Sequence, residues 1–97
     1  MDLSQRPRFR DFESRMGIHF RVRKPDGSPV GEWLLDACEW LPKPPLDFLV
    51  HADCFALGWS GSENSPQALY EIESPDGFKS TLFAVPVSAH RMSVTIN

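Results

Sequence analysis

Short alternating apolar runs fill the last third of the chain, and glycine, proline or asparagine closes each run. Phe55, Leu57 and Trp59 alternate with smaller side chains, and residues 68–73 repeat this period of two. Such a period is typical of half-buried β-strands, because successive side chains of a strand point to opposite faces. The pattern therefore predicts strands joined by tight turns. It decides the architecture and says little about chemistry.

Residues 78–87 form the longest of these runs. Pro86 lies inside it and has no backbone N–H to donate, so we expect either an edge strand or a β-bulge there. The preceding Ser74-Pro-Asp-Gly77 has the composition of a tight turn. A further turn over residues 88–91 leads into a last strand over residues 92–96.

The first third of the chain predicts a short helix followed by a strand. Phe9, Phe12 and Met16 have the spacing of one helical face, and Gly17 follows where a left-handed cap would end the helix. Residues 18–23 then alternate strictly, so we expect a half-buried strand with a basic outer face. The expected core side consists of Ile18, Phe20 and Val22, and the outer side of His19, Arg21 and Arg23.

Residues 32–41 are ambiguous. Their apolar positions match a helical face, but a segment this short, bounded by turns and set among strands, also fits a β-ribbon. We favour a strand for its first half. The turn before it, residues 24–31, holds two prolines and two glycines. After it, three prolines between residues 42 and 45 predict an extended connection, and we expect residues 46–51 to pack over the core as loop or strand.

The chain of 97 residues is long enough for one domain with one modest core. With 41% hydrophobic and 24% charged residues, it has the composition of a globular protein. We therefore predict a mainly β fold, a small antiparallel β-barrel or sandwich with a short N-terminal helix. Residues 1–8 are expected to form a flexible basic arm, and residues 9–97 a single β domain. No internal repeat is visible.

Charge is divided unevenly along the chain. Residues 1–24 hold seven basic and three acidic side chains, whereas residues 25–97 hold three basic and ten acidic ones. A basic end on an acidic body suits docking on a charged partner, on its own body or on a neighbouring copy. Tryptophan and arginine also dominate protein–protein hot spots. The candidate interaction residues are Arg6, Arg8, Arg10, Arg21, Arg23, Trp33 and Trp40. Trp59 is instead expected in the core.

Neither a metal site nor a catalytic group emerges from the motifs. His51-Ala-Asp-Cys54 gives one His-x-x-Cys pair, but the other possible zinc ligands, Cys38 and His90, are isolated. A Cys–His nucleophile would need a thiolate held beside an imidazole, and no local signature supports one. We therefore expect no metal, no cofactor and no enzymatic activity.

The chain also carries few signals of location. No apolar run reaches the ~20 residues of a membrane span, and residues 1–8 lack the apolar centre of a signal peptide. We therefore expect no membrane contact and a cytoplasmic protein. Cys38 and Cys54 are then expected to be reduced thiols, although an oxidising compartment would allow them to pair.

A succession of short motifs runs from Phe12 to the end of the chain. They are Phe12-Glu-Ser-Arg-Met-Gly-Ile-His-Phe20, Phe55-Ala-Leu-Gly-Trp-Ser-Gly61, Pro66-Gln-Ala-Leu-Tyr70, Pro75-Asp-Gly77, Leu82-Phe-Ala-Val-Pro-Val87 and the closing Asn97. In order and spacing, over residues 9–97, they resemble a bacterial family of domains of unknown function, each about as long as this chain. Members of that family are often encoded beside phage-tail-collar or tail-fibre-like proteins. The resemblance implies a compact β domain and an accessory role beside fibre or tail components.

The chain departs from the family pattern at several positions. Ala68 replaces the glycine that follows Pro-Gln, Gly58 interrupts the apolar strand and Ile96 replaces the penultimate aromatic residue. The proline-rich residues 41–46 are not typical of the family. The family has no assigned catalytic residues, so the resemblance assigns none here.

The leading hypothesis from the sequence is a non-enzymatic structural or accessory protein that acts by protein–protein contact in a phage-tail-like or fibre-associated assembly. Its partner would be a tail- or fibre-like component or further copies of the chain, and the cytoplasmic protein could be incorporated into a phage or phage-tail-like particle. One alternative is a small phage- or bacterium-encoded inhibitor or regulator that binds one host protein. Another is a nucleic-acid binder that uses the basic N-terminal residues, although the acidic remainder would repel a polyanion.

Overall fold

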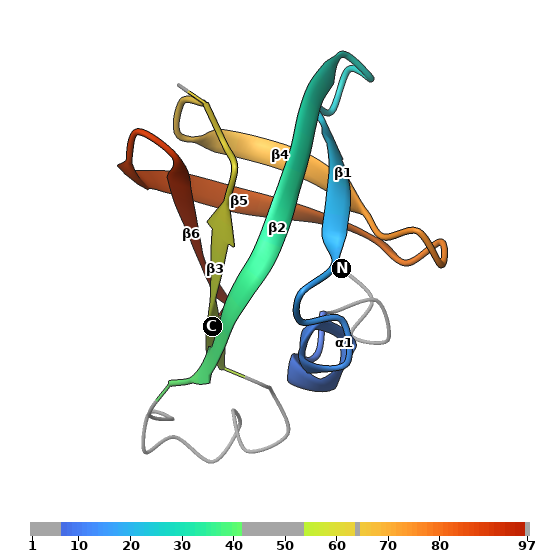
Figure 1. The fold of residues 1–97 in the computed structure, drawn as a ribbon, viewed down its shortest axis with the longest axis vertical. Coiled ribbons are helices and arrows are strands. Elements are labelled where there is room, and N and C mark those ends of the chain that lie inside the picture. The colour runs from blue at the N-terminus through green and yellow to red at the C-terminus, as the bar shows by residue number, and fades with distance from the viewer. Residues whose placement is uncertain (1–6, 42–53, 64, 97) are drawn as a thin grey trace.

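The computed structural model describes residues 7–41, 54–63 and 65–96, which form a closed barrel of six strands with one short helix (Figure 1). The elements are α1 (Phe9–Glu13), β1 (His19–Arg23), β2 (Pro29–Trp40), β3 (Phe55–Ser60), β4 (Ala68–Glu73), β5 (Lys79–Ser88) and β6 (Arg91–Ile96). Neighbouring strands are antiparallel in the order β1-β2-β3-β6-β5-β4, and β4 returns to β1. The predicted fold class is confirmed, and of the two predicted architectures the barrel is the one formed.

The barrel interior is packed with apolar side chains from every strand. Alternation sends Phe20 and Val22 of β1 inward, and it does the same for Phe55, Leu57 and Trp59 of β3. Burial of an apolar side chain of this kind contributes roughly 1.5–3 kcal/mol. The other core residues are Phe9, Phe12, Trp33, Leu35, Tyr70, Ile72, Leu82, Ala84, Met92 and Val94. The alternation predicted for β3 and β4 is therefore confirmed.

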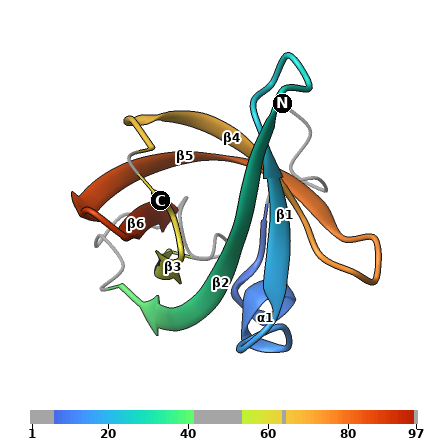
Figure 2. The ribbon, with the colours of Figure 1, turned by 45° about the horizontal axis from the view of Figure 1, so that its top comes forward.

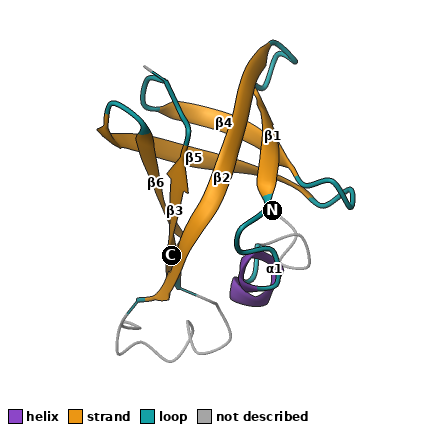
Figure 3. Ribbon diagram, viewed as in Figure 1, coloured by secondary structure: helices purple, strands orange, loops and turns teal. Residues whose placement is uncertain are grey.

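The helix α1 closes one end of the barrel, beside the ends of β1 and β2 (Figures 2 and 3). Its Phe12 ring lies 5.8 Å from the ring of Phe55, centroid to centroid. The helix is shorter than predicted, because it ends at Glu13 and leaves Met16 42% exposed rather than on the core face. Gly17 adopts the left-handed φ expected of it, +80°. Among the described residues, no helix is long and apolar enough to cross a membrane.

Strand β2 covers the ambiguous segment. It runs without a break from Pro29 to Trp40, so the helical alternative is wrong and the strand extends beyond the predicted first half. A register shift between Leu35 and Ala37 inserts an extra residue, which breaks the alternation and explains the mixed sequence signal. Pro86 also marks a bulge, because the register with β6 shifts directly after it. Ile18, expected in the core, is 37% exposed because it precedes β1.

The hairpins β1–β2 and β4–β5 are two versions of one unit. Their sequences correspond as Phe20-Arg-Val-Arg-Lys-Pro-Asp-Gly27 and Tyr70-Glu-Ile-Glu-Ser-Pro-Asp-Gly77. The amide of Gly27 donates to the Lys24 carbonyl at 2.8 Å, and the amide of Gly77 donates to the Ser74 carbonyl at 3.0 Å. Both glycines have φ of 93°, a region that favours glycine. The expectation of no internal repeat is therefore wrong, and the repeat was hidden because the outward-facing strand positions differ.

A pseudo-two-fold axis relates the first half of the barrel, β1-β2-β3, to the second half, β4-β5-β6. Corresponding strands pair with each other, β1 with β4 and β3 with β6. At the first junction Val22 faces its counterpart Ile72, and arginines of β1 lie opposite glutamates of β4 on either side. At the second junction the central pair is Gly58 with Ser93. A residue in one half can therefore be compared with the residue at the equivalent position of the other half.

Candidate functional site

An apolar strip runs along the outer face of the second half. Leu69 on β4 and Phe83 on β5 are cross-strand partners, and they are 51% and 49% exposed. Val85 follows on β5, and Val87 beyond it is 61% exposed. Single exposed apolar residues are ordinary on a protein surface, whereas a contiguous set is a candidate contact surface. We call these four residues the apolar strip.

The strip continues into segments of three neighbouring strands that contribute no formal charge of their own, and we call their outer side the uncharged face, although Arg91 and Glu39 stand at its rim. In the described strands, β5 from Ser80 to Ser88, β6 after Arg91 and the whole of β3 contain no Asp, Glu, Lys or Arg. These three strands are neighbours in the order β5-β6-β3. The chain has 24% charged residues, and removing charged groups from water is costly. Covering this face therefore costs less desolvation free energy than covering the charged parts of the barrel surface.

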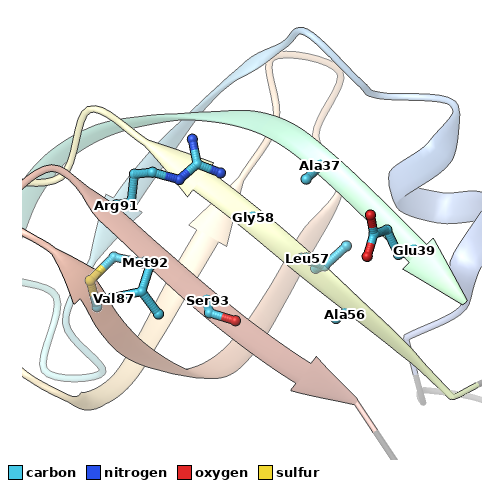
Figure 4. A pocket seen from close by; sticks show the side chains of 9 residues that line it. All are labelled: Ala37, Glu39, Ala56, Leu57, Gly58, Val87, Arg91, Met92 and Ser93. Atoms are coloured by element: carbon cyan, nitrogen blue, oxygen red, sulfur yellow. The ribbon is translucent and has the colours of Figure 1, made fainter. Parts of the chain in front are cut away.

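A groove lies next to the strip on the same face, and Figure 4 shows the residues that line it. It has a volume of about 240 Å³. Its lining includes four small residues, Ala37, Ala56, Gly58 and Ser93. Arg91 stands at one end of the groove, Glu39 stands towards the other, and Val87 of the strip forms part of the wall. The uncharged face thus combines the apolar strip with a groove.

The end of the groove at Arg91 is fixed by an ion pair that passes over Gly58. The guanidinium of Arg91 donates to both carboxylate oxygens of Asp36, at 2.6 and 3.0 Å. These hydrogen bonds lower the pKa of Asp36 below its ordinary value. A Cβ at Gly58 would lie 2.9 Å from the Cβ of Ala37 and 2.9 Å from Nη2 of Arg91. The ion pair lies so close to the backbone of Gly58 that a larger residue would clash there. This explains why Gly58 interrupts the apolar pattern of β3.

The equivalent face of the first half is polar. The pair that corresponds to Leu69 and Phe83 is His19 and Leu34, which are likewise cross-strand partners. His19 is exposed and Leu34 is half-buried. Because both pairs occupy the same place in the same hairpin unit, the fold itself does not require an apolar pair there. The strip is therefore a feature of the second half that the shared backbone plan does not explain.

The predicted basic face of β1 is partly neutralised by its neighbours. Closure of the barrel places β4 beside β1, so Nη2 of Arg23 lies 2.6 Å from Oε1 of Glu71 and 3.3 Å from Oε1 of Glu73. Arg21 is exposed, but it lies opposite Glu32 on one side and Glu73 on the other. These two candidate interaction residues therefore belong to a surface of mixed charge, which the local sequence pattern did not indicate.

Three other candidates come together at the helix end of the barrel. Arg8, Arg10 and Trp40 line a common hollow of about 380 Å³ with Phe9 and Glu13. Trp40 is 54% exposed, and its ring stacks on Phe9 with the centroids 4.1 Å apart. Trp40 is therefore exposed and accessible to a partner, and its selection as an interaction residue, like that of Arg8 and Arg10, stays a prediction.

Trp33 is a core residue, which corrects its selection as a surface candidate. It is 2% exposed and occupies an inward position of β2. Its ring centroid lies 6.2 Å from that of Trp59 and 5.0 Å from that of Tyr70. Trp59 is buried as predicted. Arg6 lies outside the described residues, so its role also stays a prediction.

Arg15, which the sequence did not single out, ties the end of α1 to the β4–β5 turn. Its Nη2 lies 2.8 Å from Oδ2 of Asp76, and its guanidinium carbon lies 4.4 Å from the centroid of the Phe78 ring. Hydrogen bonds from Arg15 and then from Ser74 lower the pKa of Asp76 to about 2. This contact holds the segment after the helix to a turn 61 residues further along the chain.

The two cysteines are free thiols. Burial, with a smaller effect of the Glu13 charge, raises the pKa of Cys38 to about 11, so this thiol is protonated near neutral pH. Cys54 is buried beside β3. His51, its possible partner in a metal pair, lies outside the described residues. Within the part of the chain that the structure describes, no three His, Cys, Asp or Glu side chains gather into a metal site.

Comparison of the chain with protein-family models, with curated proteins and with solved structures gives no match in any of the three. The family resemblance of the sequence motifs therefore remains a prediction. Evidence on function comes from the surface of the barrel.

Proposed function

We propose that this protein is a non-enzymatic binding module that acts by protein–protein contact through the apolar strip. The observation that carries the proposal is the contrast between equivalent pairs, Leu69 with Phe83 in the second half and His19 with Leu34 in the first. Only the apolar pair continues into an uncharged face. Covering apolar surface of this kind contributes roughly 25 cal/mol per Å² removed from water.

A partner would pack on side chains rather than add a strand to the sheet. Every described strand has a neighbour on both sides, because the barrel is closed. Its backbone N–H and C=O groups are therefore largely occupied, and no edge is offered for strand addition. The interior is filled by the core. The strip, the groove and the charges at the ends of the groove would then give affinity and specificity.

Within this class, the proposed role is that of an accessory protein in a phage-tail-like or fibre-associated assembly. What supports it is the succession of motifs that resembles a family encoded beside tail-collar or fibre-like proteins. The apolar strip supports contact with a protein, but it does not select the partner. A regulator that binds one host protein would use the same strip, so the identity of the captured partner decides between the two roles.

The test is capture of the partner from the native cell. The tagged protein is crosslinked and recovered in parallel with a double variant, Leu69→His with Phe83→Leu, which gives the second half the pair of the first. Leu34→Ala on the equivalent polar face is the control. We expect the wild type and the control to recover tail- or fibre-like proteins at a fixed ratio, and the double variant to lose them.

Other outcomes would redirect the proposal. Capture that is unchanged in the double variant would contradict binding through the strip. Strip-dependent recovery of one unrelated host protein would replace the accessory role by that of a regulator. Retention on nucleic acid that falls steeply with salt would favour the nucleic-acid alternative instead.

A further inference from the structure

We propose that a second copy of this chain covers the apolar strip, in a two-fold contact between the uncharged faces of two barrels. The inference rests on the proposed function, because it names a partner for the same strip. The chain has a net charge of −3, and its acidic residues lie outside β5, β3 and the described part of β6 after Arg91. At the rim of this face Arg91 neutralises Asp36 and Glu39 is the remaining acid, so two copies meet with little charge repulsion when these faces come together.

The face presents both apolar side chains and hollows. The strip runs along β5, and the groove lies beside it, lined mainly by residues of β2, β3 and β6. A second hollow of about 420 Å³ lies along the strip between β5 and β6. In a two-fold contact each copy presents both the strip and the groove, so the same packing is made twice.

The two-fold axis that would relate the two copies also brings opposite charges together at the ends of the groove. Arg91 stands at one end and remains bonded to Asp36, whereas Glu39 stands towards the other end (Figure 4). Among the described residues, Glu39 makes no side-chain hydrogen bond or ion pair. When two faces meet in antiparallel orientation, Arg91 of one copy approaches Glu39 of the other. Such rim pairs fix the orientation of a contact more than they add affinity.

The contact is expected to be weak and reversible. The strip consists of four side chains, of which three are 49–61% exposed, and so small a set covers much less than the about 800 Å² per partner that a stable interface buries. A dissociation constant on the order of 10–100 µM is expected for an interface at the small end of this range. Copies held close together on a larger assembly would associate more tightly, because their effective concentration is higher.

Sedimentation equilibrium of the purified protein, from about 5 to 500 µM around the dissociation constant expected above, tests the proposal. We expect the average mass to rise from 11.0 kDa towards twice that value as concentration increases. Phe83→Asp should remain at the mass of one chain, and Val87→Lys, at the most exposed position of the strip, provides a second disruptive variant. Leu34→Asp, the matched change on the first half, should dimerise like the wild type. Glu39→Arg should weaken dimerisation about three- to tenfold, an effect that high salt reduces.

Two results would overturn the second-copy proposal. One is a wild type that stays at the mass of one chain at every concentration, and the other is a folded Phe83→Asp or Val87→Lys variant that dimerises like the wild type. If the wild type is monomeric while the double variant Leu69→His with Phe83→Leu still loses its cellular partner, the second copy is wrong and the proposed function stands. If neither dimerisation nor capture depends on the strip, both proposals fail.

Discussion

The two halves of this barrel share a backbone plan and differ in what they present to solvent. Inward positions are apolar in both, as in Phe20 and its counterpart Tyr70, and both turns use Pro-Asp-Gly. Outward positions have diverged: His19 and Leu34 in the first half correspond to Leu69 and Phe83 in the second. Side chains that the fold needs are therefore kept in both halves. Side chains that only one half carries are the ones to explain by function.

The junctions between the halves show a second kind of divergence. Arginines of β1 face glutamates of β4 around the central pair Val22 and Ile72. Two identical halves would place like charges against each other there, whereas the two different halves attract. The difference between the halves thus makes this junction charge-complementary, and on the outer face of β5 it leaves an apolar surface.

The largest expected effect concerns the shared core. Trp33→Ala should lower the free energy of unfolding by about 3–5 kcal/mol, because it empties the centre of the barrel. Leu82→Ala, the counterpart in the second half, should cost about 2–4 kcal/mol. Urea unfolding followed by fluorescence measures both. Trp40→Ala is the control, and a larger loss for Trp40 than for Trp33 would show that the indole of Trp33 is not in the core.

The next largest effect on stability should distinguish Gly58 from Ser93, the central pair of the β3–β6 junction. Gly58→Ala should cost about 1–3 kcal/mol, because its Cβ would meet Ala37 and Arg91 at 2.9 Å. Ser93→Ala, the matched change on the other half, should stay within about 0.5 kcal/mol. Equal losses for the two variants, again from urea unfolding, would contradict the close approach of the ion pair to Gly58.

Reversal of one charge at the other junction should have a smaller effect. Arg23→Glu places a third carboxylate beside Glu71 and Glu73, and the loss is expected to be about 1 kcal/mol at low salt. The pair is partly screened, since the side chains of Arg23 and Glu71 are 28% and 34% exposed. Adding Glu71→Arg to Arg23→Glu should recover part of the loss. A loss that neither salt nor the second reversal changes would rule out charge as its cause.

The aspartates of the two equivalent turns should titrate differently. The amide of Ser28 lowers the pKa of Asp26, whereas Arg15 lowers the pKa of Asp76 to about 2 from the ordinary 3.8. The contribution of Asp76 to stability is therefore present above about pH 4 and is lost as the pH falls through about 2. Carboxyl NMR titration should show Asp76 below Asp26. Arg15→Ala should remove most of this difference, and no change in that variant would contradict the proposed contact.

Local pattern was enough to predict most strands and turns. The alternation of Phe55, Leu57 and Trp59 and the Ser74–Gly77 turn depend on neighbouring residues alone, so they could be read directly. The bulge in β2 breaks the period of two, and for this reason its sequence also matched a helix. The pairing of β1 with β4 joins residues far apart in the chain, so the neutralisation of Arg23 could not be foreseen.

The apolar strip left a sequence signal that was not used. From Leu82 to Val87, apolar side chains occupy both faces of the strand, a pattern typical of strands covered on both sides. The repeat of the two hairpins was also present in the sequence, but its outward positions carry unrelated residues. Without knowing which positions face outward, the matching Pro-Asp-Gly turns looked like two ordinary turns.

Leu69 and Phe83 are proposed to serve contact and not the fold. The most direct measurement is the free energy of unfolding of the Leu69→His with Phe83→Leu variant, at a concentration where the protein is a single chain. We expect a free energy of unfolding within about 0.5 kcal/mol of the wild type, as for other exposed positions. A loss of about 2 kcal/mol or more, typical of buried apolar positions, would show that the strip belongs to the fold and would contradict the claim.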